Sequence, residues 1–149
     1  AEAMEIVGWR LRAADADVRI VLAEPDLVVR ACPVRLQQVL INLLSNAADA
    51  VDGASDRRIE IGGERRGQRV AISIRDRGRG VPDAIRERIF DPFFTTKGVG
   101  KGLGLGLSIS YNILKDFGGD LVVANHPEGG AVFTIELNPA RMPVREAAE

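Results

Sequence analysis

The chain has 149 residues, 46% of them hydrophobic, which is enough to bury the core of one domain. Its 20 Lys and Arg residues nearly cancel its 21 Asp and Glu residues, and the net charge of -1 disfavours binding to nucleic acid or an anionic membrane as a main function. The lone Cys32 and lone His126 exclude a disulfide scaffold and a structural zinc site. No apolar stretch approaches the ~20 residues of a membrane span, so we expect a soluble cytosolic domain or the cytosolic part of a larger protein.

Hydrophobic periodicity predicts both helices and strands. Residues at helical spacing between Leu36 and Ala47 give the clearest helix, which Pro33 suits as a first turn and Gly53 ends. Alternating apolar residues indicate the strands. In chain order we predict a helix over Met4–Ala14, strands over Asp17–Ala23 and Leu27–Ala31, a helix over Pro33–Gly53, strands over Arg58–Glu64 and Arg69–Asp76, a short helix over Pro82–Phe90, a helix over Leu105–Phe117, and strands over Asp120–Ala124 and Ala131–Leu137.

These elements predict an α/β (α+β) two-layer sandwich, in which a mixed, largely antiparallel sheet packs on about three helices. We expect one domain over residues 15–138 and a disordered tail over 139–149. The segment from Asp91 to Gly104 has no period and is rich in glycine. A loop of that length inside a compact domain is usually functional or disordered, and we expect weak order from Pro92 to Leu103 when no ligand is bound.

A polar stripe runs along the predicted Pro33–Gly53 helix. Asn42, Asn46 and Asp49 are spaced i, i+4, i+7 and project from one narrow face, close to the apolar stripe. Such side chains either form a solvated face, find buried partners or line a cavity. Amide oxygens are hard neutral ligands that suit Mg²⁺ carrying phosphate oxygens and waters, so the stripe gains meaning beside a phosphate site.

The run Asp76-Arg-Gly-Arg-Gly80 follows a predicted strand directly. It fits a plain turn, with the carboxylate as a local acceptor and glycines at positive φ. Alternatively, a carboxylate at a strand end, with glycines that admit a flat ligand, accepts a hydrogen bond from an exocyclic amine such as adenine N6.

Glycines alternate with leucines from Gly102 to Leu107, where a helix is predicted to begin. The segment is neither a P-loop, because Gly102 follows Lys101 where Ser or Thr is needed, nor a dinucleotide fingerprint. Unhindered backbone amides at a helix N-terminus, with Lys97 and Lys101 nearby, make an anion site. A bare flexible linker is the alternative.

The order of these motifs resembles the catalytic, ATP-binding domain of two-component sensor histidine kinases, in the GHKL ATPase superfamily. The likeness covers Val18 to Leu137 and is closest to sensors of the C4-dicarboxylate transport and nitrogen-regulation type. The segments that carry it are Gln38–Ala50, which looks like the N box, Asp76–Gly80, like the G1 box, Phe90–Phe94, like the F box, and Gly102–Leu107, like the G2 box. The resemblance implies the Bergerat (GHKL) ATP-binding fold.

The resemblance implies that Asn46 ligates Mg²⁺, that Asn42 supports the metal and the phosphates, and that Asp76 binds the adenine amine. It also implies that Lys97 and the Gly102–Leu107 lid hold the polyphosphate, while Thr134 completes the adenine pocket through water. On this basis the catalytic residues are Asn42, Asn46 and Lys97, and the nucleotide contacts are Asn42, Asn46, Asp49, Ala50, Asp76, Gly78, Gly80, Val81, Thr95, Thr96, Lys97, Gly102, Leu103, Gly104, Leu105, Gly106, Leu107 and Thr134.

The chain departs from the family pattern at three positions. Arg77 and Arg79 stand where the family usually has Asn or Thr and then Pro, and Cys32 replaces a common Asp before Pro33. The arginine pair either stiffens the loop less than proline would or reaches a phosphate or a partner.

The implied activity is transfer of the γ-phosphoryl of Mg-ATP to a histidine, followed by relay to an aspartate of a response regulator. His126 lies in a predicted turn and lacks a helical acidic neighbour, so we expect the acceptor on a separate dimerisation domain that residues 1–14 join. The expected location is the cytoplasm, as the cytosolic part of a membrane-bound sensor.

Three other functions are weighed against this one. The main alternative is an ATP-binding regulatory domain, anti-sigma-like or degenerate, that docks a partner without phosphotransfer. Gyrase-like or chaperone-like hydrolysis is disfavoured, because a neutral amide at Asn42 cannot take a proton from water. The sequence gives little support for nucleic-acid binding, because its clustered arginines alternate with acidic residues and have no aromatic residues beside them.

Overall fold

A computed structural model describes residues 8, 12, 16–22, 33–53, 55–91 and 106–138. Within them the elements are β1 (Asp17–Leu22), α2 (Pro33–Val51), β2 (Arg58–Arg66), β3 (Arg69–Asp76), α3 (Asp83–Arg86), α4 (Gly106–Asp116), β4 (Asp120–Asn125) and β5 (Ala131–Leu137). Each matches a predicted element to within a few residues. The short helix is the exception, because it ends at Arg86 and continues as turns to Phe90. The predicted strand over Leu27–Ala31, the tail over 139–149 and, except for Gly8 and Arg12, the helix over Met4–Ala14 lie outside the described residues.

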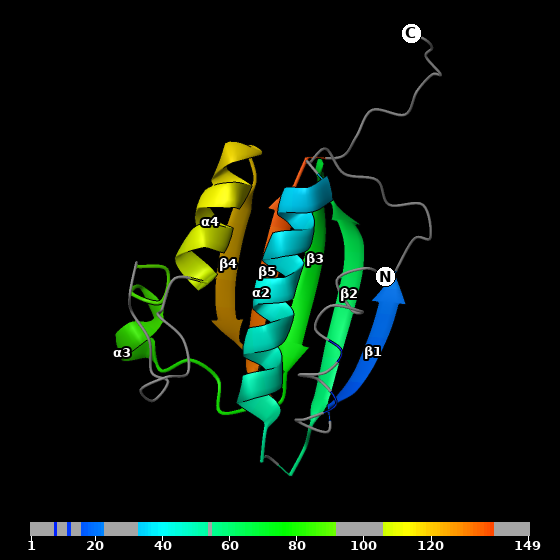
Figure 1. The fold of residues 1–149 in the computed structure, drawn as a ribbon, viewed down its shortest axis with the longest axis vertical. Helices are drawn as coiled ribbons and strands as arrows, with labels where there is room; N and C mark the ends of the chain where they lie inside the picture. The colour runs from blue at the N-terminus through cyan, green and yellow to red at the C-terminus, as the bar shows by residue number, and fades with distance from the viewer. Residues whose placement is uncertain are drawn as a thin grey trace, which may run out of the picture.

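The five described strands form one sheet in the order β1-β2-β3-β5-β4. Only β1 and β2 pair in parallel, and the other three pairs are antiparallel, which confirms the mixed, largely antiparallel sheet. Helices α2 and α4 lie side by side on one face of this sheet, as Figure 1 shows. The result is the predicted two-layer sandwich.

Alternation along the strands separates a core face from an outer face. The core face carries Ile59, Ile74 and Phe133, which are buried against the apolar stripe of α2. Leu43 and Val51 supply part of that stripe and are at most 1% exposed. Neighbouring residues such as Glu60, Arg75 and Thr134 point to the opposite, outer face, because successive strand side chains alternate.

Helices α2 and α4 run antiparallel. Arg35, near the start of α2, forms a 2.8 Å ion pair with Asp116 at the end of α4. The N-terminal turn of α4 therefore lies beside the middle of α2. Helix α4 ends as predicted at its glycine pair, where Gly118 has φ 74° and the Gly119 N–H donates to the Leu114 carbonyl at 2.8 Å. None of the described helices combines the length and the apolar character needed to cross a membrane.

Candidate functional site

Asp76 is the last residue of β3 and lies on the core face, although it is charged. It is 4% exposed. Its Oδ1 atom accepts hydrogen bonds from the Gly78 N–H at 2.8 Å and from the Ala131 N–H at 3.3 Å. Among the described residues both donors bond Oδ1, so Oδ2 keeps its acceptor capacity for a ligand. Burial raises the pKa of the Asp76 carboxyl above its ordinary value, and the two backbone hydrogen bonds oppose that rise.

The loop after Asp76 is packed between two stretches of backbone. A Cβ added at Gly78 would come within 2.6 Å of the Ala50 carbonyl oxygen at the end of α2. On the other side, a Cβ at Gly130 would overlap the Asp76 carbonyl oxygen. The structure therefore brings the end of the Asn-bearing helix, the Asp-Gly loop and the β4–β5 turn together, and glycine is what permits the close approach.

Val81 closes this loop through its backbone. The Asn125 side chain accepts a 2.7 Å hydrogen bond from the Val81 N–H and donates a 2.7 Å hydrogen bond to the Val81 carbonyl. Gly80 has a φ of 80°, and a Cβ added to it would lie 2.7 Å from the Asn125 side-chain oxygen. The last residue of β4 thus fixes the path of the chain as it leaves the loop.

Asn42 lies between two helices in a chain of polar contacts. Its Oδ1 accepts from Gln38 Nε2 at 3.2 Å, and its Nδ2 donates to the Gly106 carbonyl at 3.3 Å and to Ser110 Oγ at 3.1 Å. Ser110 is fully buried. The predicted phosphate residue of α2 therefore contacts the first turn of α4, where the predicted lid segment ends.

The predicted metal ligand Asn46 follows Asn42 by one helical turn on the same face of α2, as the sequence pattern requires. Asn46 is half-buried, and Asp49 is exposed. Among the described residues, no group of three or more His, Cys, Asp and Glu side chains is arranged so that it could hold a metal ion. Amide oxygens alone suit an Mg²⁺ ion that arrives with phosphate oxygens and waters, so the donor set fits a nucleotide-borne cation.

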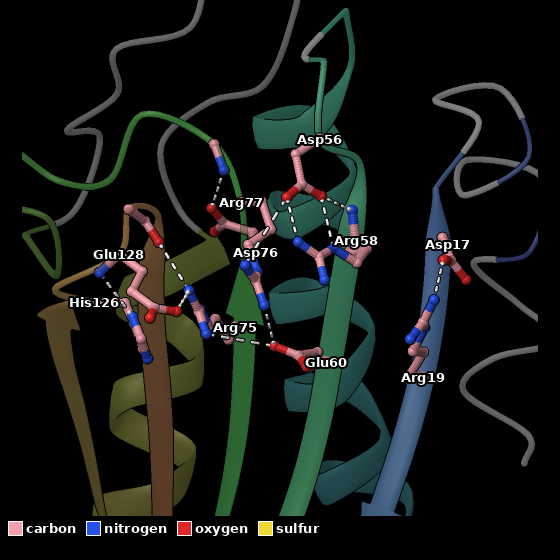
Figure 2. A network of polar contacts seen from close by, with 12 residues as sticks. Asp17, Arg19, Asp56, Arg58, Glu60, Arg75, Asp76, Arg77, His126 and Glu128 are labelled. Carbon is pink, nitrogen blue, oxygen red and sulfur yellow. Dashed lines mark hydrogen bonds and ion pairs between the residues drawn. The ribbon is translucent and has the colours of Figure 1, made fainter.

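Arg77 points away from the core face, as Figure 2 shows. Its Nη2 donates to Glu60 Oε1 at 3.0 Å, and its Nη1 lies 3.9 Å from Asp56 Oδ2. Of the roles considered for Arg77, contact with a phosphate does not fit this orientation. Arg79 is exposed.

Thr134 does not join the site, and the expectation that it completes the adenine pocket is corrected. It pairs with Ser73 of β3 and Val122 of β4, which places it on the outer face. Asp76 lies on the core face, where the β5 residue that reaches it is Ala131, through its N–H. The family resemblance implied a pocket role for Thr134, but the register of β5 places this residue on the other face of the sheet.

Several predicted residues lie outside the described part of the chain: Thr95, Thr96, Lys97, Gly102, Leu103, Gly104 and Leu105, together with the expected weakly ordered loop after Asp91. Gly106 and Leu107 form the first turn of α4. The Leu107 side chain is partly buried and packs against the core.

Residues 31–141 match the family described as histidine kinase-, DNA gyrase B- and HSP90-like ATPases. The chain belongs to this family. As a member of this family it has the GHKL α/β fold.

Curated relatives of the domain are sensor kinases. The two-component sensor PprA of Pseudomonas aeruginosa is 41% identical over 91% of this chain, and the C4-dicarboxylate transport sensor DctB of the same organism is 39% identical over 97%. The chain spans only 15% and 25% of the length of these two proteins. The finer resemblance to C4-dicarboxylate transport sensors is thus supported.

Solved structures agree. The nucleotide-free catalytic domain of histidine kinase ThkA has a TM-score of 0.78 and 35% identity, over 92% of this chain and 88% of that one. Full-length ShkA in complex with AMPPNP has a TM-score of 0.79 and 28% identity, over 98% of this chain and 31% of that one.

Four groups at this candidate site were not predicted from the sequence: the side chains of Gln38, Ser110 and Asn125, and the backbone N–H of Ala131. The Asn125–Gly130 segment was interpreted only as a turn, because its partners are distant in sequence. Gln38 had a usable signal, since it lies one helical turn before Asn42 on the same face.

Proposed function

We propose that this chain is the ATP-binding catalytic domain of a sensor histidine kinase. It binds Mg-ATP and transfers the γ-phosphoryl to a histidine on a separate dimerisation domain, from which an aspartate of a response regulator receives it. The observation that carries this proposal is the buried Asp76 carboxylate, which is fixed through Oδ1 at a strand end beside a glycine loop.

In this proposal Asp76 Oδ2 accepts a hydrogen bond from the adenine amine. The energetic reason is burial, because a carboxylate that is 4% exposed has few competing waters and gains from a new donor. Gly78 and Gly80 let the loop pack closely against Ala50 and Asn125, and Val81 forms the end of the loop. Guanine offers a carbonyl oxygen at the same position, so a buried carboxylate there discriminates against it.

The polyphosphate would lie between α2 and α4. The N-terminal turn of α4 begins at Gly106, and its backbone N–H groups with the helix dipole favour an anion. Asn46 and Asn42 would hold Mg²⁺ and the phosphates, with Lys97 and the Gly102–Leu105 segment on the other side. When bound, Mg²⁺ neutralises part of the phosphate charge that develops during phosphoryl transfer. The chain itself orients the triphosphate and supplies amide dipoles and lysine charge.

His126 is poorly suited to accept the phosphoryl group. Its Nδ1 accepts the Glu128 N–H at 3.0 Å within the β4–β5 turn, and its backbone N–H bonds the Gly130 carbonyl at 2.9 Å. The acceptor is therefore proposed on a helical hairpin domain. A neutral amide at Asn42 favours transfer to such an acceptor over hydrolysis.

The proposed partners are this dimerisation domain and a response regulator. The solved complex of ThkA with response regulator TrrA supports the second, since that kinase aligns with 93% of this chain at a TM-score of 0.75 and 32% identity. We propose a cytoplasmic location, because the proposed activity consumes ATP, and attachment to a membrane-bound sensor, as the DctB relatives suggest.

The test is titration calorimetry of ATP with and without Mg²⁺ on wild type, Asp76→Ala and Asn46→Ala, followed by phosphotransfer to a supplied helical-hairpin domain. We expect wild-type binding that weakens in Asp76→Ala and loses its Mg²⁺ dependence in Asn46→Ala. Binding without any phosphotransfer would favour the regulatory alternative instead. Phosphate appearing on His126 would contradict the assignment of the acceptor to another domain.

A further inference from the structure

Arg77 has a role that the motif comparison does not supply. We propose that Arg77 is a positioning residue for adenine binding: it ties the Asp76–Gly80 loop to strand β2 through Glu60 and Asp56, and so holds the Asp76 carboxylate in place. The proposal rests on the proposed function, since adenine binding at Asp76 is part of it.

The geometry of the tie is specific. The Arg77 side chain is only 14% exposed and lies on the outer face, where its Nη2 meets Glu60 Oε1 at 3.0 Å. Its Nη1 lies 3.9 Å from Asp56 Oδ2. Asp56 is itself fixed, because Arg58 donates to it from Nε at 3.0 Å and from Nη2 at 2.7 Å (Figure 2). The arginine therefore donates a hydrogen bond to Glu60 and lies within ion-pair distance of Asp56, which Arg58 holds in place.

The position of Arg77 in the chain connects this tie to the site. Arg77 lies between Asp76 and Gly78, inside the turn that the Asp76 Oδ1 to Gly78 N–H hydrogen bond closes. Ala50 and Gly130 pack against this turn from two other sides. A guanidinium held on the outer face thus supplies a third constraint, and the turn cannot shift without breaking it.

The charge balance also separates Arg77 from the phosphates. Glu60 serves two arginines, since Arg75 Nη1 lies 3.6 Å from the same Oε1 atom. The hydrogen bond from Arg77 is the main reason that the pKa of Glu60 lies below its ordinary value. The Arg77 charge is therefore matched by ionised carboxylates on the face opposite the proposed nucleotide.

The first experiment needs no nucleotide. Amide hydrogen exchange at Gly78 and Ala131 is followed by NMR in wild type, Arg77→Gln and Arg79→Gln. Arg79 is the matched control, because it is exposed, lies in the same loop and loses the same charge. We expect exchange at Gly78 to accelerate about tenfold in Arg77→Gln, the loss of one charge-assisted hydrogen bond, and to stay unchanged in Arg79→Gln. Equal rates in all three proteins would overturn the proposal.

The second experiment separates positioning from phosphate contact. Affinities for ATP and inosine triphosphate are compared, because inosine lacks the exocyclic amine but carries the same triphosphate. Arg77→Gln should lose ATP affinity about tenfold and inosine triphosphate affinity far less. A parallel fall in both affinities, or no fall in either, would contradict a role in positioning Asp76.

A charge exchange completes the test. The double variant Glu60→Arg with Arg77→Glu should recover part of the ATP affinity that Arg77→Glu alone loses, whereas Arg75→Gln should leave the ATP preference nearly intact. If the double variant recovers no ATP affinity, the Glu60–Arg77 ion pair is not what positions the loop for ATP binding. If wild type binds no ATP, the proposed function fails, and the exchange rates at Gly78 still decide whether Arg77 orders the loop.

Discussion

The Asn125 side chain bonds both backbone polar groups of Val81, each at 2.7 Å. The amide thereby imitates the pairing of a neighbouring strand at a point where the sheet has ended. It connects the end of β4 to the loop that carries Asp76, so a residue remote in sequence sets the shape of the proposed adenine pocket.

We expect Asn125→Ala to lower the free energy of unfolding by about 1–2 kcal/mol, because two exposed hydrogen bonds are lost. Asn125→Asp keeps the acceptor for the Val81 N–H but cannot donate to the Val81 carbonyl, so its loss should be smaller. Urea denaturation measures both, with Asn112→Ala on the exposed face of α4 as the control. Equal stability of Asn125→Ala and wild type would show that the amide contributes nothing.

Replacing Gln38 by Glu should weaken Mg-ATP binding several-fold. Gln38 Nε2 donates to Asn42 Oδ1, and a carboxylate cannot donate, so the Asn42 amide loses the contact that fixes its orientation. Gln37→Glu adds the same charge about 100° away around the helix and should have little effect. ATP titrations with and without Mg²⁺ distinguish the two variants. A similar loss in both would indicate a general charge effect.

ATP affinity should depend on pH through Asp76. Because burial raises the pKa of this carboxyl, it takes up a proton at a higher pH than an exposed aspartate does. The ionised form accepts a stronger, charge-assisted hydrogen bond from the adenine amine than the protonated form does, so affinity should fall as pH drops through the raised pKa. ATP titrations over the acidic range measure this, and Asp76→Asn should lack the transition. A pH-independent wild type would contradict the assignment.

The same shift predicts a stability effect of defined sign. The folded state holds the Asp76 proton more tightly than the unfolded state does. Ionisation of Asp76 therefore destabilises the folded state. The contribution of Asp76 to the free energy of unfolding decreases as pH rises from the ordinary aspartate pKa to the raised value. Denaturant midpoints of wild type minus those of Asp76→Asn isolate the effect from other carboxylates. A difference that increases with pH across this interval would have the wrong sign.

Gly130→Ala should be far more damaging than Gly129→Ala. Both glycines have positive φ, at 88° and 103°, so alanine at either costs about 1–2 kcal/mol in backbone strain. At Gly129 a Cβ meets nothing within 4 Å, whereas at Gly130 it overlaps the Asp76 carbonyl. We expect Gly130→Ala to lose ATP binding as well as stability. Similar melting temperatures for the two variants would count against the close packing.

Much of the fold could be predicted because the spacing of apolar residues along the sequence follows directly from which side chains are buried. The apolar spacing of α2 and the alternation in β2 and β3 gave elements with boundaries close to those observed. Strand order was not predictable, since pairing of β3 with β5 depends on contacts between residues about sixty positions apart. Sequence spacing carries no information on such pairings without a turn to define them.

Those residues of the candidate site that lie on a single helix or strand could be predicted from the sequence. Asn42 and Asn46 share a helix face by spacing alone, and Asp76 ends a strand that the alternation located. The prediction that Thr134 completes the adenine pocket was wrong, because the face on which a β5 residue lies depends on strand register. A shift of one residue reverses that face. The role of Arg77 was left open for the same kind of reason, since its partners Glu60 and Asp56 belong to another strand and its preceding loop.

Strand β1 stands apart from the rest of the sheet. Among the described strands it pairs with β2 alone, at one edge, and its residues Ile20 and Val21 are 55% and 68% exposed. None of the groups around Asp76 or Asn42 belongs to it. Local opening of this edge therefore requires little free energy and leaves the nucleotide-binding half intact. Strand β2 separates this edge from β3, which carries Asp76, so opening of the sheet at β1 does not require the carboxylate to move.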